Sequence, residues 1–175
     1  MKPESFHMVR ETAAWPPEPA IRELLLDADP DERQVAEHLA HGELHVARTQ
    51  KHGLPAGVIL IRQTAADTWE IMNCSVSPEW RRQGCGTALV LHALNLIGNK
   101  GIRYAELGTC NASPGPIALY RSCGFRMAGV IKNHFTDNYP EPVWDNGVQC
   151  IDMIRMRADL DSLPEKASIP SDQKE

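Results

Sequence analysis

The sequence predicts a single α/β domain in which a mixed, twisted β-sheet is flanked by helices. Its 175 residues, 42% of them hydrophobic, suit one ordinary globular domain with a substantial core. Strand-like segments between residues 43 and 76 follow one another through short turns, which favours antiparallel pairing. Later segments alternate strand and helix, which favours parallel pairing at the centre of the sheet.

The first half of the chain is predicted to hold two helices and three strands. Residues 1–19 are expected to be a loosely held segment, because three prolines between positions 16 and 19 interrupt regular structure. A face of apolar residues at helical spacing begins at Ile21, and Asp29 can cap a second helix that Gly42 ends. The predicted elements are helices at 20–28 and 30–42 and strands at 43–50, 56–63 and 67–76.

The second half is predicted to alternate helices and strands and to end in a tail. Val90, Ala93, Leu94 and Ile97 recur at helical spacing, and Ser113 with the proline after it makes a further helix start. The predicted elements are helices at 84–97 and 113–124, strands at 101–109, 125–133 and 148–157, and a loop at 133–149. The N-terminal segment 1–19, a domain at 20–158 and a disordered polar tail at 159–175 are therefore expected.

Net charge and cysteine usage restrict the function and the location. The formal charge is −5, so no overall positive field favours nucleic acid or an anionic membrane as a partner. No apolar run approaches the roughly 20 residues that span a bilayer, and no signal peptide is recognisable, so a cytoplasmic protein is expected. The five cysteines show no CxxC spacing, so we expect reduced, mostly buried thiols and neither a disulfide framework nor a zinc site.

The stretch "RRQGCGTALV" (81–90) places two arginines and two glycines at the start of a predicted helix. The first turn of a helix has unpaired N–H groups, and glycine lets the backbone approach a ligand, so this pattern suits a phosphate. It is not a P-loop, because Thr87 and Ala88 follow the last glycine, and Leu89 departs from the dinucleotide fingerprint. A tight strand-to-helix turn without a ligand is the alternative.

A second motif makes a family resemblance recognisable. "RRQGCG" (81–86) matches the Q/R-x-x-G-x-G/A loop of the GCN5-related N-acetyltransferase (GNAT) superfamily and follows a strand ending in "SVSPEW". "NASPGPIALYRSCGF" (111–125) is similar to the Asn…Ala-Leu-Tyr-x-x-x-Gly-Phe segment of that superfamily. The resemblance covers roughly residues 20–158, is strongest over 70–125, and includes small, poorly characterised bacterial members.

The resemblance implies the GNAT fold and an N-acetyltransferase that uses acetyl-coenzyme A (acetyl-CoA) as co-substrate, without a metal. It implies direct attack of a primary amine on the bound thioester, and we favour a small-molecule amine as acceptor. A homodimer is expected by analogy with the family. Two alternatives stay open: a catalytically silent module that only binds coenzyme A, and an enzyme that uses a longer acyl donor.

The resemblance also assigns cofactor contacts to individual residues. The end of the strand before the loop lies along the pantetheine arm in the family, and its last N–H polarises the thioester carbonyl, as an oxyanion hole does. Asn111 matches the asparagine that contacts the same arm, although a capping or turn role is the alternative. The expected cofactor-binding residues are Cys74, Ser75, Val76, Arg81, Arg82, Gln83, Gly84, Cys85, Gly86, Thr87, Asn111 and Tyr120.

Two residues are candidates for proton transfer. Tyr120 matches the tyrosine near the cofactor sulfur in the family, and a phenol can protonate the departing thiolate. Glu70 lies where some histone-acetylating members keep a general base, which a protonated amine needs before it can attack. Because Glu70 shares strand parity with Cys74 and Val76, it is expected on the same face of the sheet. A solvated strand carboxylate is the alternative.

The loop at 133–149 is the candidate for acceptor recognition. Its aromatic residues Phe135, Tyr139 and Trp144 and its carboxylates suit an organic cation. The alternative is a long hairpin that turns at residues 145–147 and packs against a dimer mate. His38, His41 and His45 are close in sequence, but Gly42 interrupts their helix, so a metal site is not expected.

Overall fold

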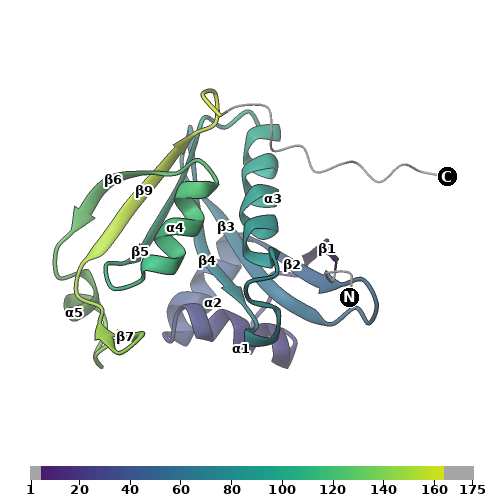
Figure 1. The fold of residues 1–175 in the computed structure, drawn as a ribbon, viewed down its shortest axis with the longest axis horizontal. Helices are drawn as coiled ribbons and strands as arrows, with labels where there is room; N and C mark the ends of the chain where they lie inside the picture. The colour runs from purple at the N-terminus through teal and green to yellow at the C-terminus, as the bar shows by residue number, and fades with distance from the viewer. Residues whose placement is uncertain (1–4, 164–175) are drawn as a thin grey trace.

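The computed structural model describes residues 5–163 and shows one seven-stranded sheet with helices on both faces (Figure 1). The strand order is β1-β2-β3-β4-β5-β9-β6, with a parallel pair at β4–β5 and antiparallel pairs at the other neighbours. The predicted mixed sheet with a parallel centre is confirmed. The strands are β1 (Phe6–Glu11), β2 (Glu43–Thr49), β3 (Pro55–Ala65), β4 (Thr68–Val76), β5 (Tyr104–Cys110), β6 (Arg126–Ile131) and β9 (Met153–Asp159).

Helices connect these strands and cover the sheet. α1 and α2 lie on one face of the sheet and α3 and α4 on the other (Figure 1). The helices are α1 (Pro19–Ala28), α2 (Glu32–His41), α3 (Cys85–Asn99), α4 (Pro114–Ser122) and α5 (His134–Asn138), with a short 3₁₀ turn at Pro78–Trp80. A small hairpin, β7 (Trp144–Asp145) and β8 (Val148–Gln149), lies outside the large sheet.

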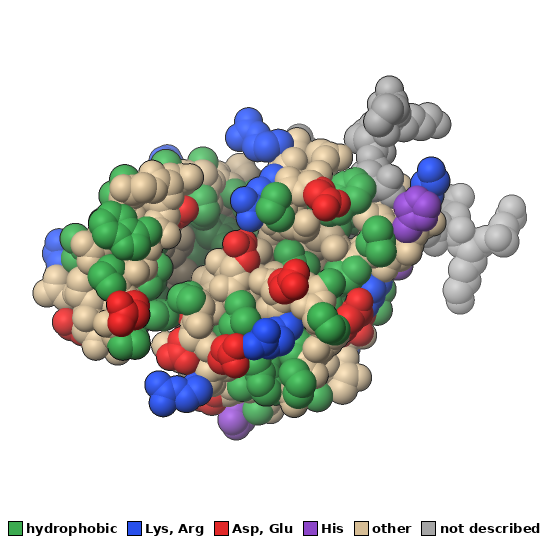
Figure 2. Space-filling view, turned by 90° about the horizontal axis from the view of Figure 1, so that it is seen from below, with side chains coloured by type: hydrophobic (Ala, Val, Ile, Leu, Met, Phe, Trp, Pro, Cys, Tyr) green, Lys and Arg blue, Asp and Glu red, His purple; other side chains and the backbone are tan. Residues whose placement is uncertain are grey.

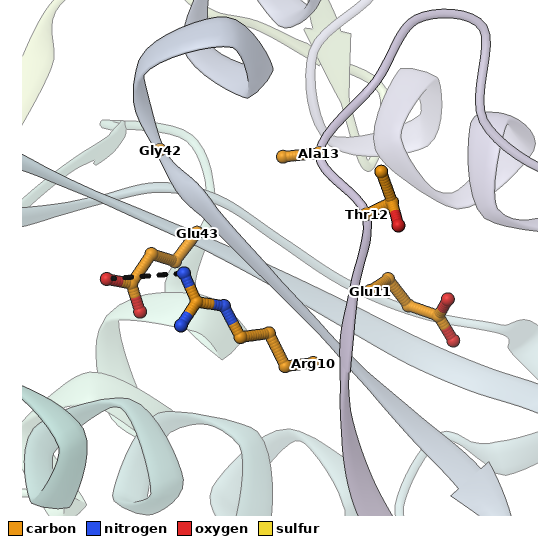
Figure 3. Close-up of a pocket in the computed structure, with 6 residues that line it drawn as sticks. All are labelled: Arg10, Glu11, Thr12, Ala13, Gly42 and Glu43. Carbon is orange, nitrogen blue, oxygen red and sulfur yellow. Dashed lines mark ion pairs between the residues drawn. The ribbon is translucent and has the colours of Figure 1, made fainter.

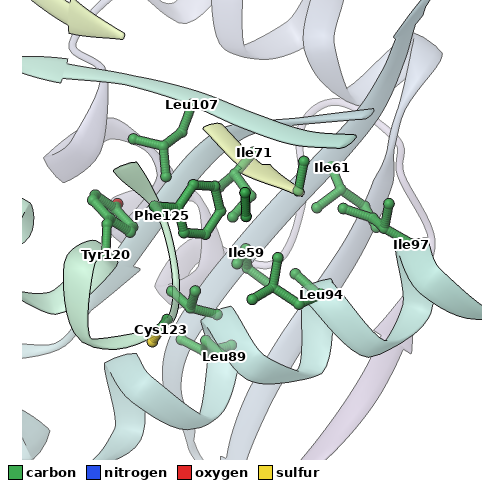
Figure 4. Packing of buried hydrophobic residues seen from close by; sticks show 14 of the residues in the cluster. Ile59, Ile61, Ile71, Leu89, Leu94, Ile97, Leu107, Tyr120, Cys123 and Phe125 are labelled. Atoms are coloured by element: carbon green, nitrogen blue, oxygen red, sulfur yellow. The ribbon is translucent and has the colours of Figure 1, made fainter. Parts of the chain in front are cut away.

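A hydrophobic core lies on each face of the sheet because β3 is apolar on both faces. Ile59 and Ile61 face α3 and pack with Leu89 in the larger core (Figure 4). Val58 and Leu60 point to the opposite face and pack under α1 and α2. This alternation with a period of two follows from strand geometry, and burial of β3 on both faces places it well inside the sheet.

The sheet opens between β4 and β5. The two strands pair from Thr68 with Tyr104 only as far as Ile71 with Leu107. Beyond this point β4 continues to Val76 on the β3 side, whereas β5 continues to Cys110 on the β9 side. Within residues 5–163, the backbone edge of β4 that faces β5 therefore has no partner strand over its last five residues, 72–76.

A β-bulge in β4 overturns the predicted parity of Glu70. Ile61 pairs with Ile71 and Leu60 with Asn73, so Met72 is an extra residue on β4. An extra residue exchanges the two faces of a strand on either side of it. Glu70 therefore faces α1 and α2, opposite the face of Cys74 and Val76 that we expected it to share. The same change places Asn73 on the face of Glu70.

The N-terminal segment is part of the sheet, not loosely held. Residues 6–11 form β1, which pairs with β2 along its whole length. α2 is capped by Asp31, whose carboxylate accepts from the N–H groups of Arg33 and Gln34, whereas Asp29 ends α1. Aspartate is a favourable N-cap residue at both positions, so capping propensity alone does not tell which of the two caps α2. Most of the predicted tail, residues 164–175, lies outside the described residues.

The prediction of reduced cysteines is wrong for one pair. Cys110 at the end of β5 and Cys150 before β9 form a disulfide with a Cα–Cα distance of 5.5 Å. They lie 40 residues apart in sequence, but β5 and β9 are neighbouring strands, so the fold brings them together. Cys74, Cys85 and Cys123 are free thiols. Among residues 5–163, no helix combines the length and apolarity that crossing a membrane requires.

Candidate active site

The start of α3 has the geometry of a phosphate site. Gly84 adopts the left-handed conformation, with φ of 85°, as the N-cap of α3, and no side chain caps the first turn. A Cβ on Gly86 would lie 3.2 Å from Leu119 Cδ2 and 3.7 Å from Val76 Cγ2, so Gly86 lets α3 approach α4 and the end of β4. Uncapped N–H groups and the positive end of the helix dipole favour an anion at this position.

The side chains of the loop are less available than its backbone. Arg81 donates from Nε to the Val76 carbonyl at 2.9 Å and pairs with Asp27 at 3.1 Å, which turns its guanidinium back toward the protein. Gln83 donates to the carbonyl of Glu79, and the Cys85 side chain is buried in the core. Arg82, in the left-handed region, and Thr87 complete the predicted set. The geometry supports a backbone site more than an arginine clamp.

The open edge of β4 can hold an extended ligand beside this loop. Cys74, Ser75 and Val76 lie on the stretch of β4 that has lost β5 as a partner. The Ser75 hydroxyl donates to Asp27, so its side chain points to the α1 face. An extended arm placed along this edge could pair with the free backbone groups, as an added strand does.

Asn111 joins the cofactor side of the site to the start of β9. Its side-chain oxygen accepts from the N–H groups of Ile151 and Asp152, each at 3.2 Å. The Asn111 N–H donates to the Asp152 carbonyl at 3.1 Å. The turn role that competed with cofactor contact at the sequence level is therefore present. The side-chain amide nitrogen of Asn111 takes part in none of these three hydrogen bonds.

Tyr120 lies in the larger core with its hydroxyl near a thiol. Its ring packs edge-to-face on Phe125, with centroids 5.9 Å apart, and the Cys74 thiol is close enough to its hydroxyl to influence the pKa of Tyr120. Burial raises the pKa of Tyr120 well above 10, so the phenol keeps its proton at neutral pH. Burial also raises the pKa of Cys74 to about 12, so that thiol is a poor nucleophile.

Glu70 belongs to a row of alternating charges on the other face of the sheet. Arg155 on β9 donates from Nη1 to Glu70 at 2.5 Å and from Nη2 to Glu106 at 3.1 Å. Arg157 pairs with Glu106 at 2.5 Å. Glu70 is thus neither the solvated carboxylate of the alternative interpretation nor an unpaired base. It is a half-buried carboxylate held by a guanidinium.

Titratable residues from several elements surround this row. Burial lowers the pKa of His38 on α2, and the charges of Asp29 and Glu70 act on the same imidazole. Burial also lowers the pKa of His134 on α5, which feels Arg155 and Asp29. Asp29 itself accepts a hydrogen bond from the Tyr139 hydroxyl at 3.2 Å. The α1–α2 turn and the 133–149 segment therefore meet over the charged row.

Figure 2, which views the molecule from below relative to Figure 1, shows a hollow between the arm that carries α5 and β7 and the body that carries α1 and α2. Phe135 and Tyr139 stack at 5.7 Å and line a cavity of about 120 Å³ that Cys150 also lines. Trp144 is 62% exposed on the hairpin and does not line that cavity. The predicted turn at 145–147 is confirmed, with Asn146 and Gly147 both at positive φ.

A larger cavity of about 340 Å³ lies elsewhere (Figure 3). Its lining includes Arg10 and Glu43, which face each other at 3.8 Å. Glu43 begins β2 and pairs with Ile61, whereas Val76 pairs with Gly57, so this cavity lies at the opposite end of the strands from the loop at 81–87. Within residues 5–163, no three His, Cys, Asp or Glu side chains are arranged to hold a metal ion.

Three features define a class of protein: a helix start without a side-chain cap, a glycine that lets α3 approach α4, and an unpaired strand edge. Together they fit an extended ligand that carries a phosphate group, as coenzyme A does, and this is the arrangement expected of a coenzyme A-dependent transferase. The model of the acetyltransferase (GNAT) family matches residues 6–125. The chain belongs to the GNAT family and is an acetyltransferase that uses acetyl-CoA.

Individual relatives agree with this assignment. The uncharacterised N-acetyltransferase YvbK of Bacillus subtilis (strain 168) is 37% identical over 140 residues, 80% of this chain and 89% of the relative. A GNAT family acetyltransferase from Elizabethkingia anophelis, solved with acetyl-CoA bound, superposes with a TM-score of 0.81 at 34% identity and covers 89% of this chain and 98% of its own. A Bacillus subtilis acetyltransferase solved with CoA has a TM-score of 0.79 at 33% identity, with the same coverage.

Sequence reasoning missed Arg155 and Glu106. A weak signal for both exists. "YAELGT" and "MIRMR" each place a charge between apolar residues of a strand, which indicates a face that is not purely core. Nothing local, however, indicates that the two strands are neighbours or that Arg155 reaches Glu70.

Proposed function

We propose that the protein transfers the acetyl group of acetyl-CoA directly to a primary amine of a small molecule. One observation carries the proposal. At the gap between β4 and β5, a buried tyrosine hydroxyl lies on one face of the sheet and a held carboxylate on the other, beside an uncapped helix start. The gap gives both groups access to a thioester bound along the open edge of β4.

The proposed reaction moves three protons and exchanges a C–S bond for a C–N bond. Glu70 accepts a proton from the acceptor ammonium, directly or through a water, and the freed amine forms a C–N bond with the thioester carbonyl. The Val76 N–H stabilises the oxyanion. The C–S bond then breaks and Tyr120 protonates the leaving thiolate, while the excess proton on the new amide nitrogen passes through water to restore the Tyr120 phenol. The products are an N-acetyl amine and the thiol of coenzyme A.

The acceptor class follows from the residues around the charged row. Asp29 lies near His38 and His134, both of which burial keeps neutral by lowering their pKa. Phe135 and Tyr139 add aromatic faces, and together with the carboxylate they suit a small organic cation. Trp144 stays a predicted contact of the acceptor. The β7–β8 hairpin would have to move for Trp144 to reach an acceptor in this corner.

The test is acetyl transfer across primary amines, read by mass spectrometry because free thiols on the protein disturb thiol-based assays. Wild type, Tyr120→Phe and Glu70→Gln are compared on spermidine, kanamycin and free lysine. Product from one amine class that falls about 100-fold in both variants supports the proposal. Unchanged product in Tyr120→Phe removes its role as acid. Binding of acetyl-CoA without product on any amine favours the silent coenzyme A-binding module.

A cytoplasmic location and a homodimer stay predictions. The disulfide bears on the first, because disulfides persist mainly in oxidising compartments. Alkylation of thiols in intact cells before lysis measures whether Cys110 and Cys150 are paired there. For the dimer, the edge strand β6 is exposed along its whole length, including Met127 at 62% and Val130 at 45%. Sedimentation of wild type against Val130→Lys tests this edge as the interface.

A further inference from the structure

Two carboxylates lie side by side where the sheet opens. Glu70 on β4 pairs in register with Glu106 on β5, one residue before the last paired position. Their side chains are only 16% and 19% exposed. Like charges directly opposite on neighbouring strands destabilise a sheet, and two close carboxylates tend to share one proton. A protonated Glu70 could not accept a proton from an amine.

Arg155 is placed to resolve this conflict. Its guanidinium lies between the two carboxylates, with Nη1 2.5 Å from Glu70 and Nη2 3.1 Å from Glu106, and it is itself 22% exposed. A planar guanidinium fixes the direction of the carboxylates that it binds, which a flexible lysine does less well. Burial alone would lower the pKa of Arg155, but hydrogen bonds to Glu70 and Glu106 outweigh it and raise the pKa.

We propose that Arg155 is a positioning residue for the acetyl transfer: it holds Glu70 charged and directed at the acceptor amine by neutralising the neighbouring Glu106. The proposal rests on the proposed role of Glu70 as the base. It adds a consequence for the acceptor. The two terminal nitrogens of Arg155, Nη1 and Nη2, each bind a protein carboxylate, so Arg155 is not expected to recognise an acceptor carboxylate, and an amine cation is the charge that this corner selects.

Other charged groups face the trio and enter any pH dependence. Arg62 on β3 lies opposite Glu70 in register, and Arg157 binds Glu106 from the outer side, where it is 47% exposed. The remaining groups around the trio are His38 on α2, Asp29 in the α1–α2 turn, and His134 and Tyr139 in the 133–149 segment. Arg157 offers a matched control because it has the same side chain on the same strand and binds Glu106.

The first test needs no acceptor. Thermal unfolding of wild type, Arg155→Met and Arg157→Met is measured from pH 5 to pH 8. In Arg155→Met, Glu70 loses its guanidinium partner and Glu106 keeps only the more exposed Arg157. The two neighbouring carboxylates should then hold a shared proton more tightly in the folded than in the unfolded chain, so stability is lost as the pH rises. We expect the Tm deficit of Arg155→Met to grow to roughly 10 °C at pH 8, and Glu106→Gln in the same chain to reverse most of it. Arg157→Met should show a small deficit with little pH dependence.

The second test reads the reaction. With the amine that wild type acetylates best, Arg155→Met should lower kcat by about 100-fold with an unchanged KM for acetyl-CoA. The acid limb of its kcat/KM profile should move to higher pH. Arg155→Lys should recover part of the rate, and Arg157→Met should stay within about twofold of wild type.

The outcomes separate the two proposals. If Glu70→Gln keeps full activity, the base role fails, whatever Arg155 does. If Glu70→Gln is inactive but Arg155→Met keeps the wild-type pH profile, the positioning role is overturned. The thermal test can also overturn the positioning role, and it needs no acceptor. It does so if the Tm deficit of Arg155→Met changes with pH no more than the Tm deficit of Arg157→Met.

Discussion

The proposed cofactor half and the proposed acceptor half of the site are built in different ways. The cofactor half consists of backbone: the first turn of α3, the unpaired edge of β4 and the glycines that allow close approach. The acceptor half consists of side chains from distant segments, such as Glu70, Arg155 and Tyr139. A disulfide joins the end of β5 to the segment that precedes β9. A backbone site depends on shape, and a side-chain site depends on which segments the fold brings together.

The largest expected effect tests whether shape governs the cofactor half. A valine at position 86 would place methyl groups against Leu119 and Val76, where even a Cβ lies 3.2 Å from Leu119. We expect Gly86→Val to raise the Kd for acetyl-CoA by about 100-fold, or about 2.7 kcal/mol, in titration calorimetry. Gly98→Ala is the control in the same helix, because its Cβ would meet Leu160 at 3.9 Å. Equal affinity in both variants would contradict a backbone site.

The disulfide should stabilise the acceptor half. Breaking the Cys110–Cys150 bridge frees a loop of 40 residues that carries Tyr120, α5 and the hairpin. Loss of such a cross-link costs about 2–4 kcal/mol, so urea unfolding of wild type should move to lower midpoints with a phosphine reductant. Cys150→Ala has no bridge to lose and should be insensitive to the reductant. The same midpoint for reduced and oxidised wild type would contradict this prediction.

Acid should destabilise the protein through a pair of histidines, His92 on α3 and His45 on β2. His92 Nε2 lies 3.0 Å from Nδ1 of the buried His45, and burial lowers the pKa of His92 to about 4. The unfolded chain takes up the proton near pH 6.5, whereas the folded chain resists it down to about 4. Stability is therefore lost as pH falls through this window. Thermal scans at pH 7 and pH 5 should show a smaller difference for His92→Gln than for wild type, and an equal difference would refute this cause.

The smallest expected effect concerns the link across the acceptor hollow. Tyr139→Phe removes the hydrogen bond from the Tyr139 hydroxyl to Asp29. A single hydrogen bond contributes about 1 kcal/mol, so we expect a roughly fivefold higher KM for the amine and no change for acetyl-CoA. Tyr104→Phe on β5 is the control, because its ring lies over Arg103 and Arg157 outside the acceptor corner. A change in the KM for acetyl-CoA alone would contradict the assignment of Tyr139 to the acceptor half.

The difference between the halves also explains how much the sequence could predict. The loop at 81–87 is contiguous and its glycines are informative, so a cofactor site could be proposed there from the sequence, and most helices and strands could be predicted. The position of Glu70 was not, because the bulge at Met72 depends on pairing with β3. The Cys110–Cys150 bridge and the contact of Arg155 with Glu70 depend on the order of β4, β5 and β9. β1 was missed because an edge strand is short and only partly apolar.

The most direct test of the account is one pair of measurements on Glu70→Gln. The substitution keeps the size of the side chain and removes its charge, and Glu70 lies on the face of β4 opposite Cys74. We expect calorimetry to show wild-type affinity for acetyl-CoA and mass spectrometry to show acetylation of the amine about 100-fold slower than wild type at saturating acetyl-CoA. Acetylation at the wild-type rate would contradict the account, because the acceptor half would then work without its carboxylate.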